Sequence, residues 1–558
     1  ARLTQRAIEM REPAVVEAGT GTGKCLHGDT LITLAGGTQK RIADLVGQTP
    51  DVVRFSDGLF ASHSTVARCW ASGEKQTYEM VTRLGHTVKA SKDHRFLTVT
   101  GWKRLEELTA GDRIATARRT PVPEESEVML AHEVAFLAHM ITDGTCSAAG
   151  YRGSVSYTKS DPALVKDLSD AVAMMGCVLK ERGEYHYGIC RAKQGKTGRN
   201  AAMLLLEQHG LTAKDSYGKF VPDAIFRLPG WRLAIFLGRL FSGDGSVDAE
   251  RSIVEYSTVS RRLAEQVQHL LLRFGVVASL AVKNGRYNGE PHVSWRLTIS
   301  GKQNVEAFHH NIGLSMVGDK ADRLRDAVRR LEEIEGNPNY DVIPREIMPA
   351  VMESLAAVGG NDASLRREGI RIRPEHKGIS RRNMLLIGKL TGNRLFSDLA
   401  TSDVYWDEIM SIEPAEVAQT YDIEMVGEPN FVANDIIVHN SYSYAAICMA
   451  MNKKVIISTS NKALQMQLIE KDLPFLQRIW PGKKVAVSVG KGNYACRLKC
   501  EPLSAVMQNH DDLARWFCTT ATGNTEEIDF AIDGRALKSI AVDDECTGKH
   551  CPLYADCF

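Results

Sequence analysis

Residues 14–24 read AVVEAGTGTGK, which is the first half of a phosphate-binding motif. Ala14–Ala18 predicts a short buried strand, and Gly19, Gly21, Gly23 and Lys24 follow it. Such glycines let backbone N–H groups approach phosphates, while the lysine reaches the β and γ oxygens. A Ser or Thr that binds Mg²⁺ and the start of a helix should come next. Cys25 follows instead, with a sequence typical of turns and strands.

The residues that complete this motif stand far downstream. Ser441 opens a segment, Ser441–Ile447, that is typical of a helix, and Lys454–Thr459 reads as the next strand. Joining Lys24 directly to Ser441 therefore restores a strand, loop, helix and strand in the order of a P-loop unit. We interpret residues 25–440, 416 residues in all, as an insert within a split α/β P-loop domain. The alternative is an ordinary multidomain ATPase with Cys25 in the metal-ligand position.

Length and composition agree with several domains in one chain. At 558 residues it is too long for one core, since domains usually hold about 100–200 residues. The formal net charge is +1, so any nucleic-acid site must be a local patch. No apolar run approaches the roughly 18 residues that a membrane span needs, which predicts a cytoplasmic protein without a membrane partner. The start at Ala1 and the end at Phe558 suggest a fragment.

The two ends of the insert carry a set of nucleophiles. Cys25 can attack the carbonyl of Lys24 to form a thioester, and Ser441 can take over the acyl group. Asn440 can attack its own carbonyl with its side-chain amide and so release the insert, while His439 polarises or protonates that bond. This chemistry requires no cofactor. Each residue alone would more often be structural, and it is their combination at both ends that indicates self-splicing.

These residues resemble the end motifs of inteins, and the resemblance spans the whole insert. It is carried by Cys25-Leu26-x-Gly28-Asp29-Thr30, by Val438-His439-Asn440-Ser441 and by Ser91-x-Asp93-His94. The resemblance implies an all-β, horseshoe-shaped splicing domain of the Hint type. It also implies that His94 distorts or protonates the first amide and that Asp422 activates Cys25 or Ser441. Pro429 stands where many inteins carry a histidine. A self-cleaving module that does not ligate is the alternative, and Ser441 argues against it.

A repeated unit lies between the two ends. Phe136–Gly144 is echoed by Phe236–Gly245, and the acidic residues Asp143 and Asp244 stand 101 positions apart. Each unit continues into a strand with a tyrosine (Tyr157, Tyr256), a helix and a terminal glycine (Gly176, Gly275). The duplication predicts a pseudo-twofold α+β domain in which the paired carboxylates hold Mg²⁺ for phosphodiester hydrolysis.

The repeated units resemble the paired helices of LAGLIDADG homing endonucleases. Lys219 and Lys320 match the lysine-bearing blocks of that family, which implies that they assist at the scissile phosphates of double-stranded DNA. His139 and Thr142 depart from its usual small or apolar residues. The alternative is a decayed copy without activity. The basic segment Leu365–Lys389 is a further site of phosphate contact or a solvated connecting face.

The flanking residues 1–24 and 441–558, here called the host segments, resemble a superfamily 2 DNA helicase. Gln5 is spaced for adenine recognition, and the loop has Ala18 in place of a first glycine. Seven of the twelve cysteines lie in 441–558, which in a reduced compartment suggests a metal site. Their order resembles the iron–sulfur domain of DinG- and XPD-type helicases, which implies a [4Fe–4S] cluster on Cys496, Cys546, Cys551 and Cys557. Zn²⁺ is the alternative metal, and Cys500 is a competing ligand.

The sequence thus predicts a multidomain chain with two activities in one insert. We expect an intein that splices and cuts DNA, monomeric as a released protein, inside an ATP- and Mg²⁺-dependent helicase that binds single-stranded or forked DNA. No sequence for water activation follows the P-loop, so the host segments alone do not complete an ATPase cycle. Alternatives are a chain that acts chiefly as a helicase, and a degenerate intein. The expected domains are 1–24 and 441–490 (P-loop parts), 25–120 and 401–440 (splicing domain), 121–400 (endonuclease) and 491–558 (partial iron–sulfur domain).

Overall fold

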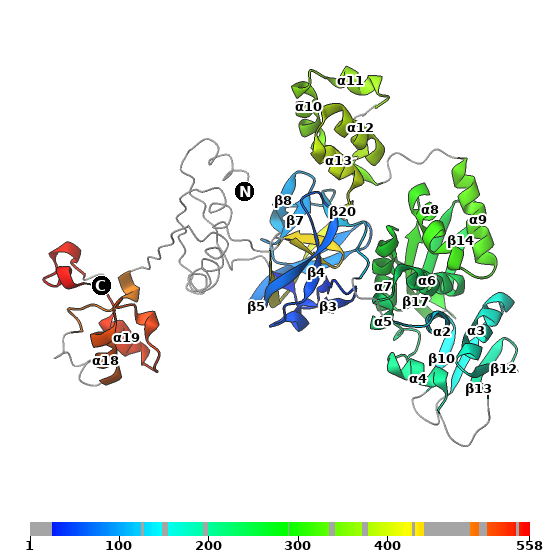
Figure 1. Cartoon of the computed structure of the whole chain (residues 1–558), viewed down its shortest axis with the longest axis horizontal. Helices are drawn as coiled ribbons and strands as arrows, with labels where there is room; N and C mark the ends of the chain where they lie inside the picture. The colour runs from blue at the N-terminus through cyan, green and yellow to red at the C-terminus, as the bar shows by residue number, and fades with distance from the viewer. Residues whose placement is uncertain are drawn as a thin grey trace. The chain divides into compact units, whose positions relative to one another are not determined.

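A computed structural model describes most of the insert and part of the second host segment (Figure 1). The chain divides into two compact units, one of Gly19–Tyr442 and one of Ala1–Ala18 with Ser443–Phe558. Within the described residues, no helix is both long enough and apolar enough to cross a membrane. The described residues are 25–123, 128–147, 154–192, 199–287, 290–333, 341–370, 378–426, 430–439, 491–500, 511–542 and 546–557.

The two ends of the insert fold together into one β-rich part, the splicing domain. Its strands form a 12-stranded sheet in the order β3-β2-β21-β22-β9-β20-β1-β6-β5-β4, with β7 paired to β22 and β8 paired to β7. Strands from both ends of the insert therefore alternate in one sheet. The strands are β1 (Leu26–His27), β2 (Leu31–Thr33), β3 (Gln39–Arg41), β4 (Asp51–Phe55), β5 (Ala61–Thr82), β6 (Thr87–Ala90), β7 (Arg95–Thr98), β8 (Gly101–Arg104), β9 (Arg113–Ala117), β20 (Val404–Met425), β21 (Asn430–Ala433) and β22 (Ile436–His439).

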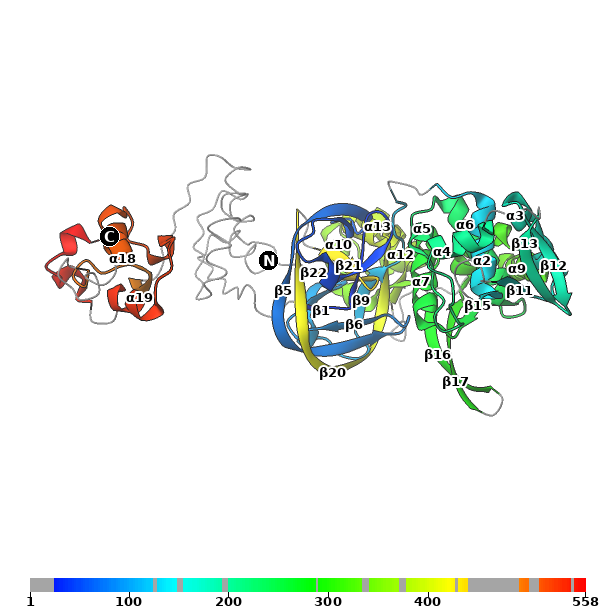
Figure 2. The same ribbon diagram turned by 90° about the horizontal axis from the view of Figure 1, so that it is seen from below.

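Alternating burial explains why these segments are strands. In β6 and β7 every second side chain is buried, as expected for a sheet with one face on a core. In the sequence, the alternating runs Thr30–Leu34, Gln76–Thr82 and His86–Ala90 predict short strands. The structure confirms them as β2, the end of β5, and β6. The long strands β5 and β20 run antiparallel with several register shifts, and Figure 2 shows them curving together. Such bulges bend a strand pair, which lets one pair wrap around the domain.

The repeated units form two similar halves of an endonuclease-like part. Each half holds a four-stranded sheet, β10-β11-β13-β12 in the first and β14-β15-β17-β16 in the second, so the predicted duplication is confirmed. The strands are β10 (Gly144–Cys146), β11 (Val155–Thr158), β12 (Cys177–Gly183), β13 (His186–Arg191), β14 (Gly245–Asp248), β15 (Ile253–Thr258), β16 (Ser279–Tyr287) and β17 (Glu290–Ile299). The helices are α2 (Ala131–Thr142), α3 (Pro162–Met174), α4 (Ala201–Gln208), α5 (Asp223–Phe226), α6 (Gly230–Asp244), α7 (Arg261–Leu271), α8 (Lys302–Asn311) and α9 (Asp319–Glu332).

The equivalent helices α2 and α6 pack closely between the two halves. A Cβ atom on Gly243 would lie only 2.6 Å from the side chain of Thr142, so the glycine permits this approach. The expected helix-terminating glycines, Gly176 and Gly275, have φ values of 69° and 67°. Tyr157 and Tyr256 pair with Gly144 and Gly245 and are fully buried. The two halves therefore repeat each other in detail.

A helical segment follows the endonuclease-like part, within the range 121–400 expected for that domain. Its core side chains, including Ile343, Val351 and Phe396, join a cluster with Phe55 and Trp406 of the splicing domain. The segment therefore shares its core with the splicing domain. It comprises β18 (Val342–Pro344), α10 (Met348–Ala357), α11 (Asp362–Arg367), β19 (Gly378–Ser380), α12 (Arg381–Thr391) and α13 (Arg394–Thr401).

The described residues of the second host segment form a small separate core. Ala495, Cys500, Leu513 and Ile540 are its buried residues. Its helices are α18 (Asp511–Thr519) and α19 (Gly534–Ile540).

Candidate functional sites

Cys25 lies at the centre of the splicing domain, between two neighbouring strands. Its amide N–H donates to Oγ of Ser91 over 3.0 Å, and its carbonyl oxygen accepts from the amide of Ser91 over 3.0 Å. Oγ of Ser91 also donates to that carbonyl oxygen over 3.3 Å. Both residues are almost fully buried. The Ser91 side chain thus contacts the amide nitrogen that has to leave when the bond before Cys25 breaks.

A lysine that the sequence motifs do not include contacts the predicted nucleophile, Cys25. Nζ of Lys75, on β5, donates to Sγ of Cys25 over 2.9 Å. A cation beside a thiol favours the thiolate, which is the reactive form. Lys75 is therefore a candidate for activating Cys25. Only its position opposite Ala418 of β20 brings it here, so no spacing in the sequence could have indicated it.

Asp422 lies on the other side of Cys25. The antiparallel pairing of Leu26 with Tyr421, continued by one residue, places Cys25 opposite Asp422. The carboxylate is nearly buried and accepts a hydrogen bond from the amide of Ile423 over 2.9 Å. Burial, followed by the charge of Asp422, raises the pKa of the nearby Cys69 to about 12. Cys69 is therefore a protonated thiol that does not compete with Cys25.

His94 and Asp93 follow Ser91 in a tight turn. The amide of His94 donates to the carbonyl oxygen of Ser91 over 3.0 Å, and the His94 side chain is 1% exposed. Its ring lies edge-on against Phe96, with centroids 5.3 Å apart. Asp93 instead forms an ion pair with Arg104, at 3.8 Å. Of the two predicted residues, the structure thus buries His94 within this turn, while Asp93 pairs with a partly exposed arginine.

The last strand of the insert lies beside the same turn. Val438 of β22 pairs with Phe96 of β7, and the ring of His439 contacts Trp102 edge-on, with centroids 4.7 Å apart. Since β7 begins directly after His94, the turn that Cys25 contacts through Ser91 leads into the strand that pairs with β22. Several predicted residues lie outside the described residues, namely Asn440 and Ser441 at the second junction and Gln5, Gly19, Gly21, Gly23 and Lys24 of the P-loop.

The two aspartates of the repeat also come together. Asp143 caps the C-terminal end of α2, and Asp244 is the last residue of α6. Burial, and then the charge of Asp143, raises the pKa of Asp244 to about 6. Two carboxylates that repel each other in a partly buried place are suited to hold a divalent cation. The described residues contain no group of three or more metal-ligating side chains. Mg²⁺, however, is commonly held by one or two carboxylates together with substrate phosphates, so this pair fits it.

Both predicted lysines lie beside these aspartates in equivalent positions. Nζ of Lys219 donates to the carbonyl oxygens of Thr142 and Gly144, at 2.8 and 3.1 Å. Nζ of Lys320 donates to the carbonyl oxygens of Ser242 and Gly243, both at 2.7 Å. Burial lowers the pKa of each lysine. Each repeat therefore brings one lysine against the backbone around its own aspartate.

The first repeat has a further lysine that sequence reasoning did not find. Nζ of Lys159 lies 2.7 Å from Oδ2 of Asp143 and donates to the carbonyl oxygen of Gly243 over 3.2 Å. It stands directly after β11, the strand that carries Tyr157. The acidic pair is thus surrounded by three lysines, which suits a site for an anionic phosphodiester.

The unusual His139 has a structural partner. Its Nε2 lies 2.8 Å from Oδ2 of Asp167 on α3, and Arg239 of α6 contacts the same carboxylate at 2.7 Å. His139 and Arg239 are equivalent residues of the two repeats. Both lower the pKa of Asp167 far below its ordinary value, against the effect of burial. One carboxylate therefore connects the two central helices, which explains a residue that departs from the usual pattern.

The arginines of the basic segment Leu365–Lys389 lie in different environments. The Arg366 side chain is exposed and pairs with Asp362 at 2.7 Å. Arg381 is nearly buried, and it contacts Asp341 at 2.8 Å as well as carbonyl oxygens at the end of α13. Arg381 is therefore a structural residue that joins this segment together.

The predicted cluster cysteines are not gathered in the described residues. Cys546 and Cys557 are exposed, whereas Cys496 and Cys551 are partly buried. Burial, then the charge of Cys496, raises the pKa of Cys500 to about 12. Cys500 and Cys557 line one cavity of about 470 Å³. No group of three or more metal-ligating side chains occurs in the part that the structure describes, so the cluster on these four cysteines stays a prediction.

Comparison with known families identifies one match over most of the chain. The model of the "Intein splicing domain" matches residues 32–440. The replicative DNA helicase DnaB of Synechocystis is 32% identical over 449 residues, which cover 76% of this chain and 50% of that protein. Protein RecA of Mycobacterium tuberculosis is 26% identical over 477 residues, which cover 79% and 59%. The chain thus spans about half the length of the curated relatives it matches.

Solved structures match parts of the chain at low overall similarity. A structure of the Ssp DnaB mini-intein variant M86 is 36% identical and covers 19% of this chain and 68% of that chain, with a TM-score of 0.17. A structure of I-DmoI in complex with DNA and Mn is 15% identical and covers 33% and 96%, with a TM-score of 0.24.

Proposed function

Because this chain belongs to the intein splicing family, we propose that residues 25–440 excise themselves and join Lys24 to Ser441. The observation that carries this proposal is the environment of Cys25. Its sulfur accepts a hydrogen bond from Lys75, and its amide nitrogen contacts the hydroxyl of Ser91. Lys75 thus contacts the attacking sulfur, and Ser91 contacts the nitrogen of the bond that must break. Both contacts lie at one buried place.

The first step is an acyl shift at the amino end of the insert. Sγ of Cys25 attacks the carbonyl carbon of Lys24, and the bond from that carbon to the nitrogen of Cys25 breaks. Lys75 donates a hydrogen bond to the attacking sulfur, and His94 supplies the proton that the leaving nitrogen takes up. Ser91 holds the Cys25 backbone in place. The product is a thioester with a free amino group on Cys25, so no atom is lost.

The later steps move the acyl group and release the insert. Oγ of Ser441 attacks the thioester, and the thiol of Cys25 leaves with the hydroxyl proton. The side-chain nitrogen of Asn440 then attacks its own carbonyl carbon, which breaks the bond to Ser441 and leaves a succinimide on the insert. His439 gives the proton to the departing nitrogen of Ser441. That amine finally attacks the ester carbonyl, the bond from this carbon to Oγ of Ser441 breaks and restores the hydroxyl, and an ordinary peptide bond forms.

A pair of variants separates these steps. Cys25→Ala blocks the acyl shift, so only cleavage after residue 440 should remain. Asn440→Ala blocks release, so only cleavage before Cys25 should remain, most clearly when dithiothreitol is added. The double variant should stay intact. Complete splicing in either single variant would show that the nucleophiles are assigned wrongly.

A second function is cleavage of double-stranded DNA. It is supported by the partly buried pair of Asp143 and Asp244, with Lys219 and Lys320 on the adjacent backbone. Mg²⁺ held there would activate water and stabilise the leaving oxygen. The lysines place positive charge where the scissile phosphates would lie. Asp143→Asn or Asp244→Asn should abolish cleavage of a plasmid that carries the joined insertion site, while splicing continues. Cleavage by either variant would contradict this assignment.

The host segments are proposed to come from an ATP-dependent DNA helicase. The relatives described above include a helicase, but their matches cover about three-quarters of this chain. The insert alone occupies about the same share, so these matches do not identify the host. The host proposal therefore depends on the divided P-loop and on the cysteine order. None of these relatives is described as an iron–sulfur protein. The DinG- or XPD-type proposal is tested by measuring iron content and absorbance near 400 nm in the spliced host and in its Cys551→Ser variant. A host that contains only zinc would exclude it.

A further inference from the structure

The endonuclease-like part reaches into the splicing domain at the turn between β21 and β22. Asn434 and Asp435 form this turn with φ values of 47° and 61°, a conformation that needs support. Asn434 is held by the splicing domain, since its Oδ1 accepts from the amide of Leu31 and its Nδ2 donates to the carbonyl oxygen of Thr87, both over 2.7 Å. The side chain of Asp435 is held differently.

Asp435 pairs with a histidine from the other part of the insert. Its Oδ1 lies 2.7 Å from Nδ1 of His269 on α7. The two side chains are 7% and 1% exposed, so water hardly reaches them. Although burial opposes ionisation, the charges of His269 and then of His86 bring the pKa of Asp435 below its ordinary value. Removing one partner of a buried pair leaves a group without compensation, which is costly.

The two parts of the insert also contact each other directly around this pair. Nε2 of Gln268 and the amide of Leu280 both donate to the carbonyl oxygen of Leu84, at 2.8 and 2.9 Å. Gly37 and Gly85 of the splicing domain have φ values of 88° and 86°. A Cβ on either would come within 2.5 Å of a backbone oxygen in the endonuclease-like part. Both glycines therefore permit direct backbone contact between the two parts.

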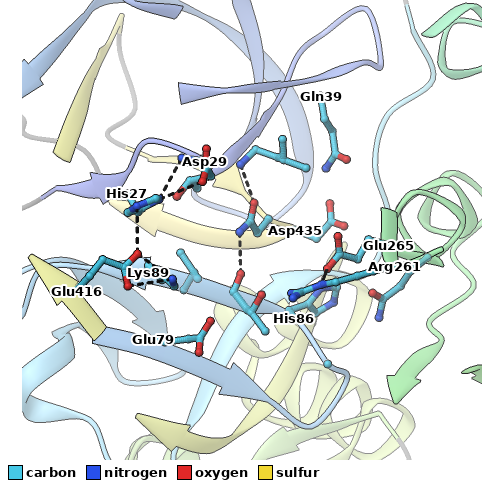
Figure 3. Close-up of a pocket in the computed structure, with 17 residues that line it drawn as sticks. His27, Asp29, Gln39, Glu79, His86, Lys89, Arg261, Glu265, Glu416 and Asp435 are labelled. Atoms are coloured by element: carbon cyan, nitrogen blue, oxygen red, sulfur yellow. Dashed lines mark hydrogen bonds and ion pairs between the residues drawn. The ribbon is translucent and has the colours of Figure 1, made fainter. Parts of the chain in front are cut away.

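A polar cleft of about 350 Å³ lies at the same boundary between the two parts (Figure 3). Arg261 and Glu265 of α7 lie on one side of it, and Asp435 and His86 of the splicing domain line it as well. His27, two residues after Cys25, contacts Glu416 at 3.4 Å within the same cleft. The turn at Asp435 is thus enclosed by residues from both parts of the insert.

We propose that His269 is a positioning residue for the second splice junction. This inference rests on the proposed splicing function. Strand β22 begins directly after Asp435 and ends at His439, so a shift of the turn moves His439 along the strand. Since the first junction is held by Ser91 and Lys75, loss of His269 should slow cleavage after residue 440 more than thioester formation. The endonuclease-like part is then a structural component of the splicing site.

The test compares two substitutions at His269. His269→Leu keeps the apolar volume but removes the donor, and His269→Asn places an N–H close to the position of Nδ1. Cleavage after residue 440 is measured in the Cys25→Ala background, and thioester formation by dithiothreitol cleavage in the Asn440→Ala background. We expect His269→Leu to slow cleavage after residue 440 about tenfold, equivalent to about 1.4 kcal/mol. Thioester formation should slow less than about twofold. His269→Asn should restore most of the first rate.

His139→Leu is the matched control, because it breaks a buried histidine–aspartate pair of similar length inside the endonuclease-like part. It should leave both rates unchanged. If His139→Leu slows cleavage as much as His269→Leu does, or if His269→Asn is as slow as His269→Leu, the effect is general destabilisation and the inference is wrong. Wild-type rates in His269→Leu would also overturn it.

Asp435→Ala probes the pair from the other side. It should slow cleavage after residue 440, and the His269→Leu/Asp435→Ala double variant should be no slower than the slower single variant, because the two substitutions remove one contact. Additive effects would overturn the inference. Failure of the parent chain to splice at all would instead contradict the proposed function, so the two failures are distinguishable.

Discussion

The ammonium group of Lys75 donates a hydrogen bond to the sulfur of Cys25 over 2.9 Å, although the residues stand 50 positions apart. Replacing Lys75 with methionine keeps the length of the side chain and removes the charge. We expect thioester formation, measured by dithiothreitol cleavage, to slow about tenfold because the attacking sulfur loses its contact with this cation.

Lys89→Met is the control for this substitution. Lys89 lies on neighbouring β6 and pairs with Glu416 rather than with Cys25. Its replacement should leave thioester formation unchanged. Equal rates for Lys75→Met and the parent chain would show that the Lys75 contact has no catalytic role.

Acid should weaken Mg²⁺ binding at the proposed site between the two repeats. Burial and the charge of Asp143 raise the pKa of Asp244 to about 6, so a proton competes with Mg²⁺ below that pH. We predict that the Mg²⁺ concentration for half-maximal DNA cleavage rises as the pH falls from 7 to 5. A requirement for Mg²⁺ that does not vary over this range would contradict the assignment.

The same carboxyl group should affect the stability of the metal-free protein in the opposite direction. Its folded-state pKa of about 6 lies above the ordinary 3.8, so the folded state binds more protons than the unfolded state between these values. The contribution of Asp244 to the free energy of unfolding therefore increases as the pH falls through this window. Comparing melting temperatures of the parent and Asp244→Asn at pH 7 and 5 measures it, and the stability advantage of the variant should be smaller at pH 5.

The shared carboxylate of Asp167 should be a main support of the endonuclease-like part. Asp167→Ala leaves His139 and Arg239 without their partner in a mostly buried place. We expect a loss of about 3 kcal/mol in the free energy of unfolding, measured with urea. Asp170→Ala, on the same helix, removes only an exposed pair with Lys166 and should cost less than about 1 kcal/mol. Similar losses in both variants would contradict this role.

The sequence allowed the local features to be predicted but not the contacts that register creates. The strands at 76–82 and 86–90, the duplicated half-domains and the glycines that end helices were visible because pattern and spacing determine them. The positions of Lys75 and Lys159 were not, since they depend on strand pairing between distant segments.

The helical segment after the endonuclease-like part illustrates the same limit for domains. Its helices have ordinary amphipathic sequences, and composition does not say which core they join. Phe396 and Ile343 lie with Trp406 of the splicing domain because the chain returns there at β20. Likewise, nothing in the sequence around His269 distinguishes it from other helical residues, and only the fold places Asp435 beside it. A pairing between two domains has no signal in either sequence segment alone.

Intact-mass measurement of the expressed chain tests the central claim most directly. The account predicts two products, an insert of residues 25–440 that ends in a succinimide or its hydrolysis product, and a ligated host of 142 residues. Fragmentation of the ligated host should find a peptide bond between Lys24 and Ser441. A chain of 558 residues that remains intact under native conditions, or host segments that are cleaved but never joined, would contradict it.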